Sequence, residues 1–280
     1  MSDQAKYKQL CERLMKGLKL ESVPVAVQFS TNPPPNVPKL EEKTKACSML
    51  DLARLEGRVF YTLADNHTCK NGSHYLGMTK PFKGLETGDW YCGKYPDQGR
   101  AMYPSPVVAR RNNNYYIKIP ENTVNVISYA PLDNCPFDTR HGGIVVVLMC
   151  NPKQGLYLTR SATYHMGGVV TGITGPSTCS VIMAGPFERG EMMTTLGCYG
   201  GRLYVKIKSE EEFIGLPVEM LENTVEALER VLNDRPDLKR MLAEGVGTYH
   251  VATPEEIDAQ IAKGPLAELM NRGSFEESAS

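Results

Sequence analysis

The sequence has no long hydrophobic run, and no segment approaches the roughly 20 apolar residues that a membrane-spanning helix needs. An excess of charge is also missing, because 31 basic residues face 32 acidic ones and the formal net charge is −1. No overall field therefore attracts nucleic acid or an acidic membrane surface. Residues 1–20 lack the apolar core of a signal peptide and indicate an amphipathic helix. We expect a cytoplasmic protein that binds neither nucleic acid nor membranes.

Several functional motifs are absent as well. No C-x-x-C pair occurs, which excludes the zinc-ribbon and bacterial-ferredoxin spacings. Neither G-x-G-x-x-G nor the Walker pattern is present, and there is no G-x-S-x-G elbow. Disulfides are rare in cytoplasmic proteins, so any cluster among the eight cysteines has to be assembled by the fold.

What the chain does contain is a repeated segment that ends in a cysteine. GRVFYTLADNHTC runs from Gly57 to Cys69, and GGVVTGITGPSTC runs from Gly167 to Cys179, at a constant offset of 110 residues. Each has a glycine, a β-branched or aromatic run, a polar turn and then Thr-Cys. A duplicated unit of this kind predicts a pseudo-two-fold axis that brings two distant thiols together.

Short apolar runs alternate with segments of helical spacing, which predicts an α/β fold. We expect a single mixed-sheet domain with two pseudo-symmetric halves over residues 1–220, and a C-terminal helical extension over 221–280 packed on it. Strands are expected at 23–29, 59–63, 115–119, 124–129, 144–150 and 203–207, and helices at 3–20, 46–56, 152–166, 217–242 and 254–270. Residues 80–106, rich in Gly, Pro and aromatic side chains, predict a loop that covers a pocket beside the cysteines.

Four of the cysteines lie where helices or glycine-rich turns begin. Cys69 and Cys179 each follow a threonine at an expected helix start, and Cys47 stands one residue into its helix. Cys198 lies in LGCYGGR, where glycines allow close backbone approach. Free N–H groups and the dipole at a helix start stabilise a thiolate. The alternative for each cysteine is burial as a small hydrophobic side chain.

Catalytic partners for these thiols are few. His67 lies two residues before Cys69, and His74 lies five after it. A histidine beside a cysteine suits nucleophilic catalysis or zinc binding, and Arg202 could hold an anionic substrate. Each of the three also has an ordinary structural interpretation, as a satisfied core histidine or a surface ion pair.

ACSMLDLARLEGRVFYTLADNHTC, followed by LGM, and the later TCSVIMAGPF with LGCYGGR resemble the DUF169 (ArCR) family over roughly residues 8–220. This is a family of uncharacterised archaeal and mostly anaerobic bacterial proteins. The resemblance implies that its cysteine pattern falls on Cys47, Cys69, Cys179 and Cys198. The chain departs from the family in having Ser-Thr-Cys where G-x-C is usual before the third cysteine.

The resemblance leads to three hypotheses for function. The first is a [4Fe–4S] cluster held by Cys47, Cys69, Cys179 and Cys198 and used for electron transfer, or for redox or lyase chemistry on a small molecule. The second is a structural zinc site made by the same four residues. The third is a non-redox binding module with buried cysteines. Whether the chain is an iron–sulfur-dependent oxidoreductase or lyase stays open at this point, as does homo-oligomer formation; a small molecule or a redox protein is the expected partner.

Overall fold

Seven strands form one mixed sheet at the centre of the protein. A computed structural model describes residues 3–94, 102–121, 123–175 and 177–234, together with 239, 240, 242, 253–255 and 259. The strand order across the sheet is β2-β3-β1-β4-β7-β6-β5, and every neighbouring pair is antiparallel except β5 and β6. The strands are β1 (Val25–Ser30), β2 (Phe60–Thr62), β3 (Val126–Pro131), β4 (Gly143–Cys150), β5 (Thr171–Gly172), β6 (Met193–Thr195) and β7 (Glu212–Pro217).

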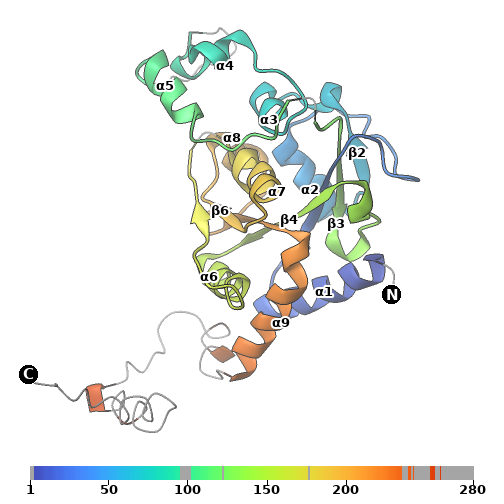
Figure 1. The fold of residues 1–280 in the computed structure, drawn as a ribbon, viewed down its shortest axis with the longest axis vertical. Helices are drawn as coiled ribbons and strands as arrows, with labels where there is room; N and C mark the ends of the chain where they lie inside the picture. The colour runs from blue at the N-terminus through green and yellow to red at the C-terminus, as the bar shows by residue number, and fades with distance from the viewer. Residues whose placement is uncertain are drawn as a thin grey trace, which may run out of the picture. The chain divides into compact units, whose positions relative to one another are not determined.

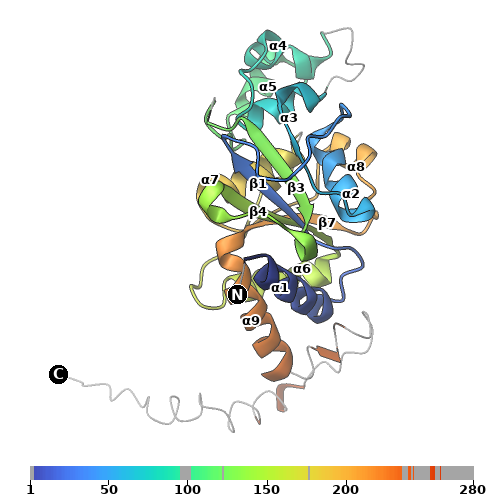
Figure 2. The ribbon, with the colours of Figure 1, turned by 90° about the vertical axis from the view of Figure 1, so that its right-hand side faces the viewer.

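Helices cover both faces of the sheet, which confirms the α/β class (Figures 1 and 2). One face carries α1 (Asp3–Leu18), α6 (Pro152–Ala162) and α9 (Val218–Asp234), which contact one another. The other carries α2 (Ala46–Glu56), α3 (Lys70–Tyr75), the π-helix η5 (Ser180–Ala184), α7 (Gly185–Arg189) and α8 (Tyr199–Tyr204). Within the described part of the chain, no helix is long and apolar enough to span a bilayer.

The central strands are buried because both faces are covered. β4 reads GIVVVLMC, and seven of its eight residues are buried; a continuous apolar run of this kind is typical of a strand packed on both sides. Val27 of β1 and Tyr129 of β3 face the same layer as Met49 of α2 and Ile182 of η5, and they share one core with them. This core fixes α2 and η5 on the sheet, and both helices begin at a predicted site cysteine.

A pseudo-two-fold axis passes between β1 and β4 at the centre of the sheet. On one side the order is β1, β3, β2, and on the other it is β4, β7, β6. Along the chain each half runs strand, helix, short strand, short helix, strand: β1-α2-β2-α3-β3 and β4-η5/α7-β6-α8-β7. The first half contains α4 (Lys83–Thr87) and α5 (Pro106–Asn113) in addition, between α3 and β3, and the second contains α6 and β5. The predicted pseudo-symmetric halves are therefore present.

The register of the duplication differs from the one expected from the sequence. Cys47 lies at the start of α2, which ends at the left-handed Gly57 (φ 68°). Cys179 precedes η5, which continues directly into α7, and α7 ends at the left-handed Gly190 (φ 66°). The equivalent of Cys47 is thus Cys179, and the equivalent of Cys69 is Cys198. The 110-residue offset instead matched β2 with β5, which pairs in parallel with β6 and lies at the other edge of the sheet.

Small insertions explain why this register is hard to see. Ten positions separate Cys47 from Gly57, whereas eleven separate Cys179 from Gly190. The π-helix η5 accommodates the extra residue, because a π-turn is a one-residue insertion into a helix. The first half, in turn, has the extra turn η1 (Ala64–Asn66) between β2 and its second cysteine.

Two expected strands do not form. Residues 115–119 are turn and irregular backbone, and residues 199–204 form α8, followed by irregular backbone, where a strand was expected at 203–207. The second error has a local cause: the Cys198 sulfur accepts a hydrogen bond from the Gly201 N–H and starts a helix there. The strands at β1, β2, β3 and β4 are confirmed within one or two residues at each end.

The chain divides into two compact units, Met1–Pro236 and Asp237–Ser280. The sequence placed a boundary after residue 220, but α9 belongs to the first unit, where it packs on α6 and α1. The helix expected at 254–270 falls largely outside the described residues. The packing of 221–280 on the rest of the chain stays a prediction.

Candidate functional site

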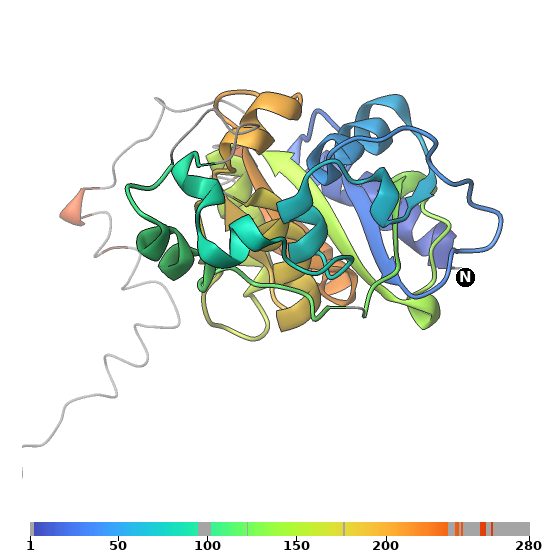
Figure 3. The same ribbon diagram turned by 90° about the horizontal axis from the view of Figure 1, so that it is seen from above.

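Four helix starts converge on one side of the sheet, and each contributes a cysteine. Cys47 is the second residue of α2, and Cys69, Cys179 and Cys198 immediately precede α3, η5 and α8. Seen from above, the orange α8 lies beside the blue α2 (Figure 3), and the two helices are in contact. The four predicted site cysteines line one cavity of about 610 Å³.

The Cys69 and Cys198 sulfurs accept equivalent hydrogen bonds, as the pseudo-symmetry requires. The Cys69 sulfur accepts a hydrogen bond from the Gly72 N–H at 3.4 Å, and the Cys198 sulfur accepts one from the Gly201 N–H at 3.2 Å. Each sulfur thus takes the place of an N-cap oxygen. Gly201 has no room for a side chain, because a Cβ there would lie 2.6 Å from Thr178 Oγ1.

Cys179 and Cys198 are joined through the residues around them. Thr178 Oγ1 accepts the Cys198 backbone N–H at 2.7 Å, and Ser177 Oγ lies 3.6 Å from the Cys179 sulfur. A Cβ built at Gly72 would lie 3.4 Å from the Cys179 sulfur and 3.5 Å from the Cys69 sulfur. The sulfurs of Cys69 and Cys179 therefore both border Gly72 in the first turn of α3.

Burial keeps these thiols protonated. It raises the pKa of Cys47 to about 12, and the neighbouring Cys198 and Cys69 add to the effect. Burial likewise raises the pKa of Cys179 well above its usual value and raises that of Cys69, where the Gly72 N–H opposes it. At Cys47, Cys69 and Cys179 the thiolates expected from the helix starts do not form at neutral pH, because desolvation outweighs the helix N–H groups.

The predicted iron–sulfur function is wrong on this geometry. Among the described residues, no three His, Cys, Asp or Glu side chains form a group that could hold a metal ion. The four cysteines surround a cavity instead. The same finding counts against the structural zinc hypothesis. That Cys47, Cys69, Cys179 and Cys198 form a binding site stays a prediction.

Alkylation measures this protonation directly. We expect iodoacetamide to modify Cys47 in the native protein at least about 30-fold more slowly than in the unfolded chain near pH 8, because the fraction of thiolate is much smaller. The native rate should rise about tenfold per pH unit and level off only near pH 12, where the raised pKa is reached. Peptide mapping by mass spectrometry gives the rate. A native Cys47 that reacts as fast as the unfolded one would contradict the raised pKa.

The predicted histidines lie outside the cavity lining. His67 is buried, with its Nε2 3.0 Å from Thr62 Oγ1, and burial lowers its pKa to about 4. His74 is also buried; its Nδ1 lies 3.1 Å from the Thr79 carbonyl oxygen, and burial lowers its pKa. Both side chains are therefore neutral at pH 7 and held by local hydrogen bonds, and a catalytic role for either stays a prediction.

Arg202 has a structural role, because its side chain binds backbone carbonyl groups. Its guanidinium donates to the carbonyl oxygens of Leu196 (2.7 Å), Lys208 (3.1 Å) and Glu211 (2.6 Å). These bonds join the two ends of the segment between β6 and β7. Arg202 is not among the residues that line the cysteine cavity, so binding of a substrate by this side chain also stays a prediction.

The segment predicted to cover the cavity does border it. Phe82, Trp90, Tyr91 and Met102 all line the cavity, which confirms the expected position for the described part of residues 80–106. The segment is more regular than a loop, since it contains α4 (Lys83–Thr87), the turn η2 (Trp90–Cys92) and the start of α5 (Pro106–Asn113). Residues 95–101 lie outside the described residues, and closure over a ligand stays a prediction.

Three polar side chains of the cavity were missed in the sequence. Lys45 precedes Cys47 by two residues, and Lys70 and Asn71 follow Cys69 directly. Their proximity to the cysteines along the chain was the available signal. This signal is weak, because a lysine at a helix start is ordinarily a surface residue.

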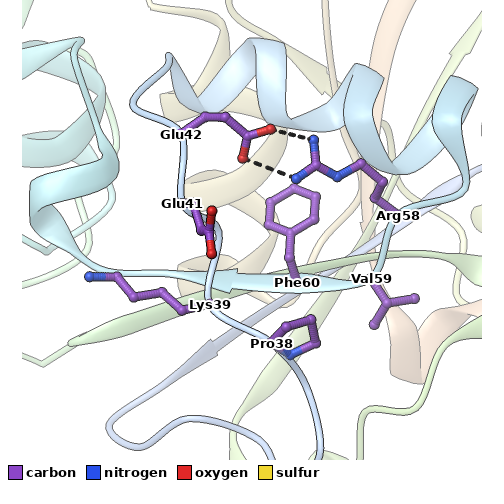
Figure 4. A pocket seen from close by; sticks show the side chains of 7 residues that line it. All are labelled: Pro38, Lys39, Glu41, Glu42, Arg58, Val59 and Phe60. Atoms are coloured by element: carbon purple, nitrogen blue, oxygen red, sulfur yellow. Dashed lines mark hydrogen bonds and ion pairs between the residues drawn. The ribbon is translucent and has the colours of Figure 1, made fainter.

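A second cavity lies at the β2 edge of the sheet and is of similar size, about 600 Å³. Its cationic side chains are already paired: Arg58 donates to both oxygens of Glu42, at 2.7 and 3.0 Å (Figure 4), and Lys39 pairs with Asp65 at 3.2 Å. The cysteine cavity differs in this respect, because no carboxylate stands beside its two lysines among the described residues of the lining.

The comparisons with known proteins agree with the extent of this fold. A family model described as DUF169, uncharacterised ArCR, matches residues 13–227. The chain is also 30% identical to an uncharacterised protein of Methanocaldococcus jannaschii, MJ0308, over 237 residues, which cover 81% of this chain and 95% of that protein. No solved structure matches the chain. The matched region includes both halves of the sheet and all four cavity cysteines.

Proposed function

Because the chain belongs to the DUF169 family, whose description assigns no activity, its function has to be inferred from the cavity, and we propose that it binds a small organic anion there. The observation that carries the proposal is the lining, which among the described residues has two lysines, four cysteines and an aromatic wall, and no Asp or Glu. A cavity of about 610 Å³ is within the usual range for small-molecule sites.

The two lysines supply uncompensated positive charge. Lys45 Nζ lies 3.6 Å from the centroid of the Tyr204 ring, a cation–π contact that holds the side chain at the cavity. Among the described residues, neither Lys45 nor Lys70 forms an ion pair. The charge of Lys45 also acts to lower the pKa of Cys69, against the larger effect of burial, so its field extends to the sulfurs.

The aromatic wall suits a planar apolar body. Phe82 and Trp90 meet edge to face with their ring centroids 5.5 Å apart, and Trp90 meets Tyr91 in the same way at 5.7 Å. Together with Met102 these side chains present apolar surface to the cavity. The thiols of Cys47, Cys69 and Cys179 complete the fit, because a neutral S–H group is a small hydrophobic surface and a weak donor, and does not repel an anion.

Trp90 provides a direct test, because it is the single tryptophan of the chain and lines the cavity. We expect benzoate to change Trp90 fluorescence saturably, and its neutral analogue benzamide to bind at least tenfold more weakly. Lys45→Gln should weaken benzoate binding about tenfold, the loss expected for a hydrogen bond to a charged group. Lys45→Gln combined with Lys70→Gln should abolish it.

Lys39→Gln is the matched control, since Lys39 pairs with Asp65 outside this cavity. It should leave benzoate affinity unchanged. The proposal fails if benzoate causes no saturable change up to about 10 mM, a limit that corresponds to a binding free energy of about −3 kcal/mol. It also fails if benzamide binds as well as benzoate.

A further inference from the structure

The positive charge of the cysteine cavity comes from two neighbouring segments of the chain. Lys45 is the N-cap residue of α2, and Lys70 is the first residue of α3. Two backbone hydrogen bonds hold these segments side by side: the Thr44 N–H donates to the Asn66 carbonyl oxygen and the Thr68 N–H donates to the Thr44 carbonyl oxygen, each at 2.9 Å. The backbone positions of the two lysines are therefore fixed relative to each other.

The charged ends of both side chains, and not only their aliphatic stems, lie at the cavity. Lys45 Nζ is 3.6 Å from the centroid of the Tyr204 ring, and Lys70 Nζ is 5.7 Å from that of the Phe82 ring. At these distances a ring attracts a cation, and both rings line the cavity. Lys45 is half-buried and Lys70 is exposed, so both side chains have surface that a ligand can reach.

The two rings belong to different walls of the cavity. Tyr204 is the last residue of α8, which packs on α2, whereas Phe82 directly precedes α4, which packs on α5 and η2. In both side views α4 lies apart from α8 (Figures 1 and 2). The two ammonium groups, although they start from neighbouring segments, are thus held at different places along the lining. This arrangement favours two separate anionic groups on the ligand over a single one.

The pseudo-symmetry shows that both charges belong to the first half. Counted from the equivalent cysteines, Ser177 stands where Lys45 does and Tyr199 stands where Lys70 does. All four residues line the cavity, and neither residue of the second half is basic. Two like charges in one cavity repel each other, and a ligand with a single negative charge leaves one of them uncompensated. A ligand with two negative charges compensates both.

We propose that Lys45 and Lys70 each bind one carboxylate of a small planar dicarboxylate whose two charged groups stand apart. Resting on the proposed function, this narrows the ligand class from organic anions to dianions of this shape. Lys45 supplies the stronger contact, because charges that are partly buried are screened less by salt and water than exposed ones. Lys70 determines specificity, because only a second carboxylate on the ligand uses it.

The test compares ligands that differ in one charge. Isophthalate and terephthalate, which carry two carboxylates on one benzene ring, are titrated by calorimetry beside their monomethyl esters and benzoate. We expect at least one dicarboxylate to bind about tenfold more tightly than its own monomethyl ester, the gain from one hydrogen bond to a charged group. Phenyl phosphate carries both charges on one group. If it binds most tightly while both dicarboxylates only equal their esters, the lysines share one dianionic group and the inference is overturned.

Three variants assign the preference for a second carboxylate. Lys70→Gln should remove it while benzoate affinity changes less than about threefold, and Lys70→Arg, which keeps the charge, should retain it. Lys83→Gln is the matched control, because Lys83 is exposed and follows Phe82 but does not line the cavity; it should leave the preference unchanged.

The outcomes separate the two proposals. If benzoate binds but neither dicarboxylate binds better than its ester, or if Lys70→Gln keeps the preference, this inference is overturned and the anion site stands. If neither benzoate nor any dicarboxylate binds, both proposals fail.

Discussion

Replacing Arg54 with methionine is expected to lower the free energy of unfolding by about 3–5 kcal/mol, because it leaves a buried carboxylate without its counter-charge. Arg54 donates to Asp51 Oδ1 at 2.7 Å, and both side chains are buried. Arg54 also donates to the Lys206 carbonyl oxygen at 2.6 Å, and Asp51 Oδ2 accepts the Lys206 backbone N–H at 2.6 Å. The pair thus joins α2, which begins at Cys47, to the segment that follows α8.

Urea denaturation of the two matched variants separates this pair from a surface one. Arg58→Met removes the partner of Glu42, an exposed ion pair, and should change stability far less than Arg54→Met. Asp51→Asn combined with Arg54→Met should recover part of the loss, since no charge remains buried. Equal losses of stability for the two arginine variants would show that burial does not determine how much the Asp51–Arg54 pair contributes to stability.

Replacing Gly215 with alanine is expected to cost about 3 kcal/mol or more, at the upper end of overpacking effects. Gly215 lies in β7 directly beneath η5, and a Cβ there would run into the Ile182 carbonyl oxygen of the π-helix. The contact involves backbone on both sides, so no side-chain rotation can relieve it. Because η5 begins at Cys179, the variant should also change the cavity, seen as an altered Trp90 emission spectrum.

Gly172→Ala in β5 is the control for this effect. The nearest atoms to a Cβ at that position are Thr194 Cγ2 at 3.3 Å and the Thr194 carbonyl oxygen at 3.4 Å. A small shift accommodates them, so thermal unfolding should change little. A Gly215→Ala protein as stable as the Gly172→Ala protein would contradict the close packing of the π-helix on β7.

The sequence predicted those features that depend on local pattern. The apolar runs at β1 and β4 were found because continuous β-branched residues are typical of buried strands. The helix expected at 46–56 has these bounds in the structure, and Gly57 follows it as a left-handed C-cap, a conformation that favours glycine. Cys47, Cys69, Cys179 and Cys198 were placed together from a family resemblance, and the structure arranges them around one cavity.

Features that depend on three-dimensional distances could not be predicted from the sequence. The iron–sulfur hypothesis needed four sulfurs around one centre, and sequence spacing carries no information on whether they surround a metal or a cavity. Asn71 resembles any asparagine in the first turn of a helix, and only the structure shows that it lines the cavity and donates a hydrogen bond to the Tyr91 hydroxyl. The strand expected at 203–207 failed because a sulfur cap, a rare helix start, overrode an alternating pattern.

Because of the pseudo-two-fold axis, each half of the molecule provides an internal control for the other. A substitution at Cys69 can be paired with the same substitution at Cys198, in a second copy of the same backbone arrangement within one chain. Effects common to both positions report the scaffold, and effects confined to one report recognition. The difference between Lys70-Asn71 and Tyr199-Gly200 already divides the cavity in this way, into a polar wall and an apolar wall built on one repeated frame.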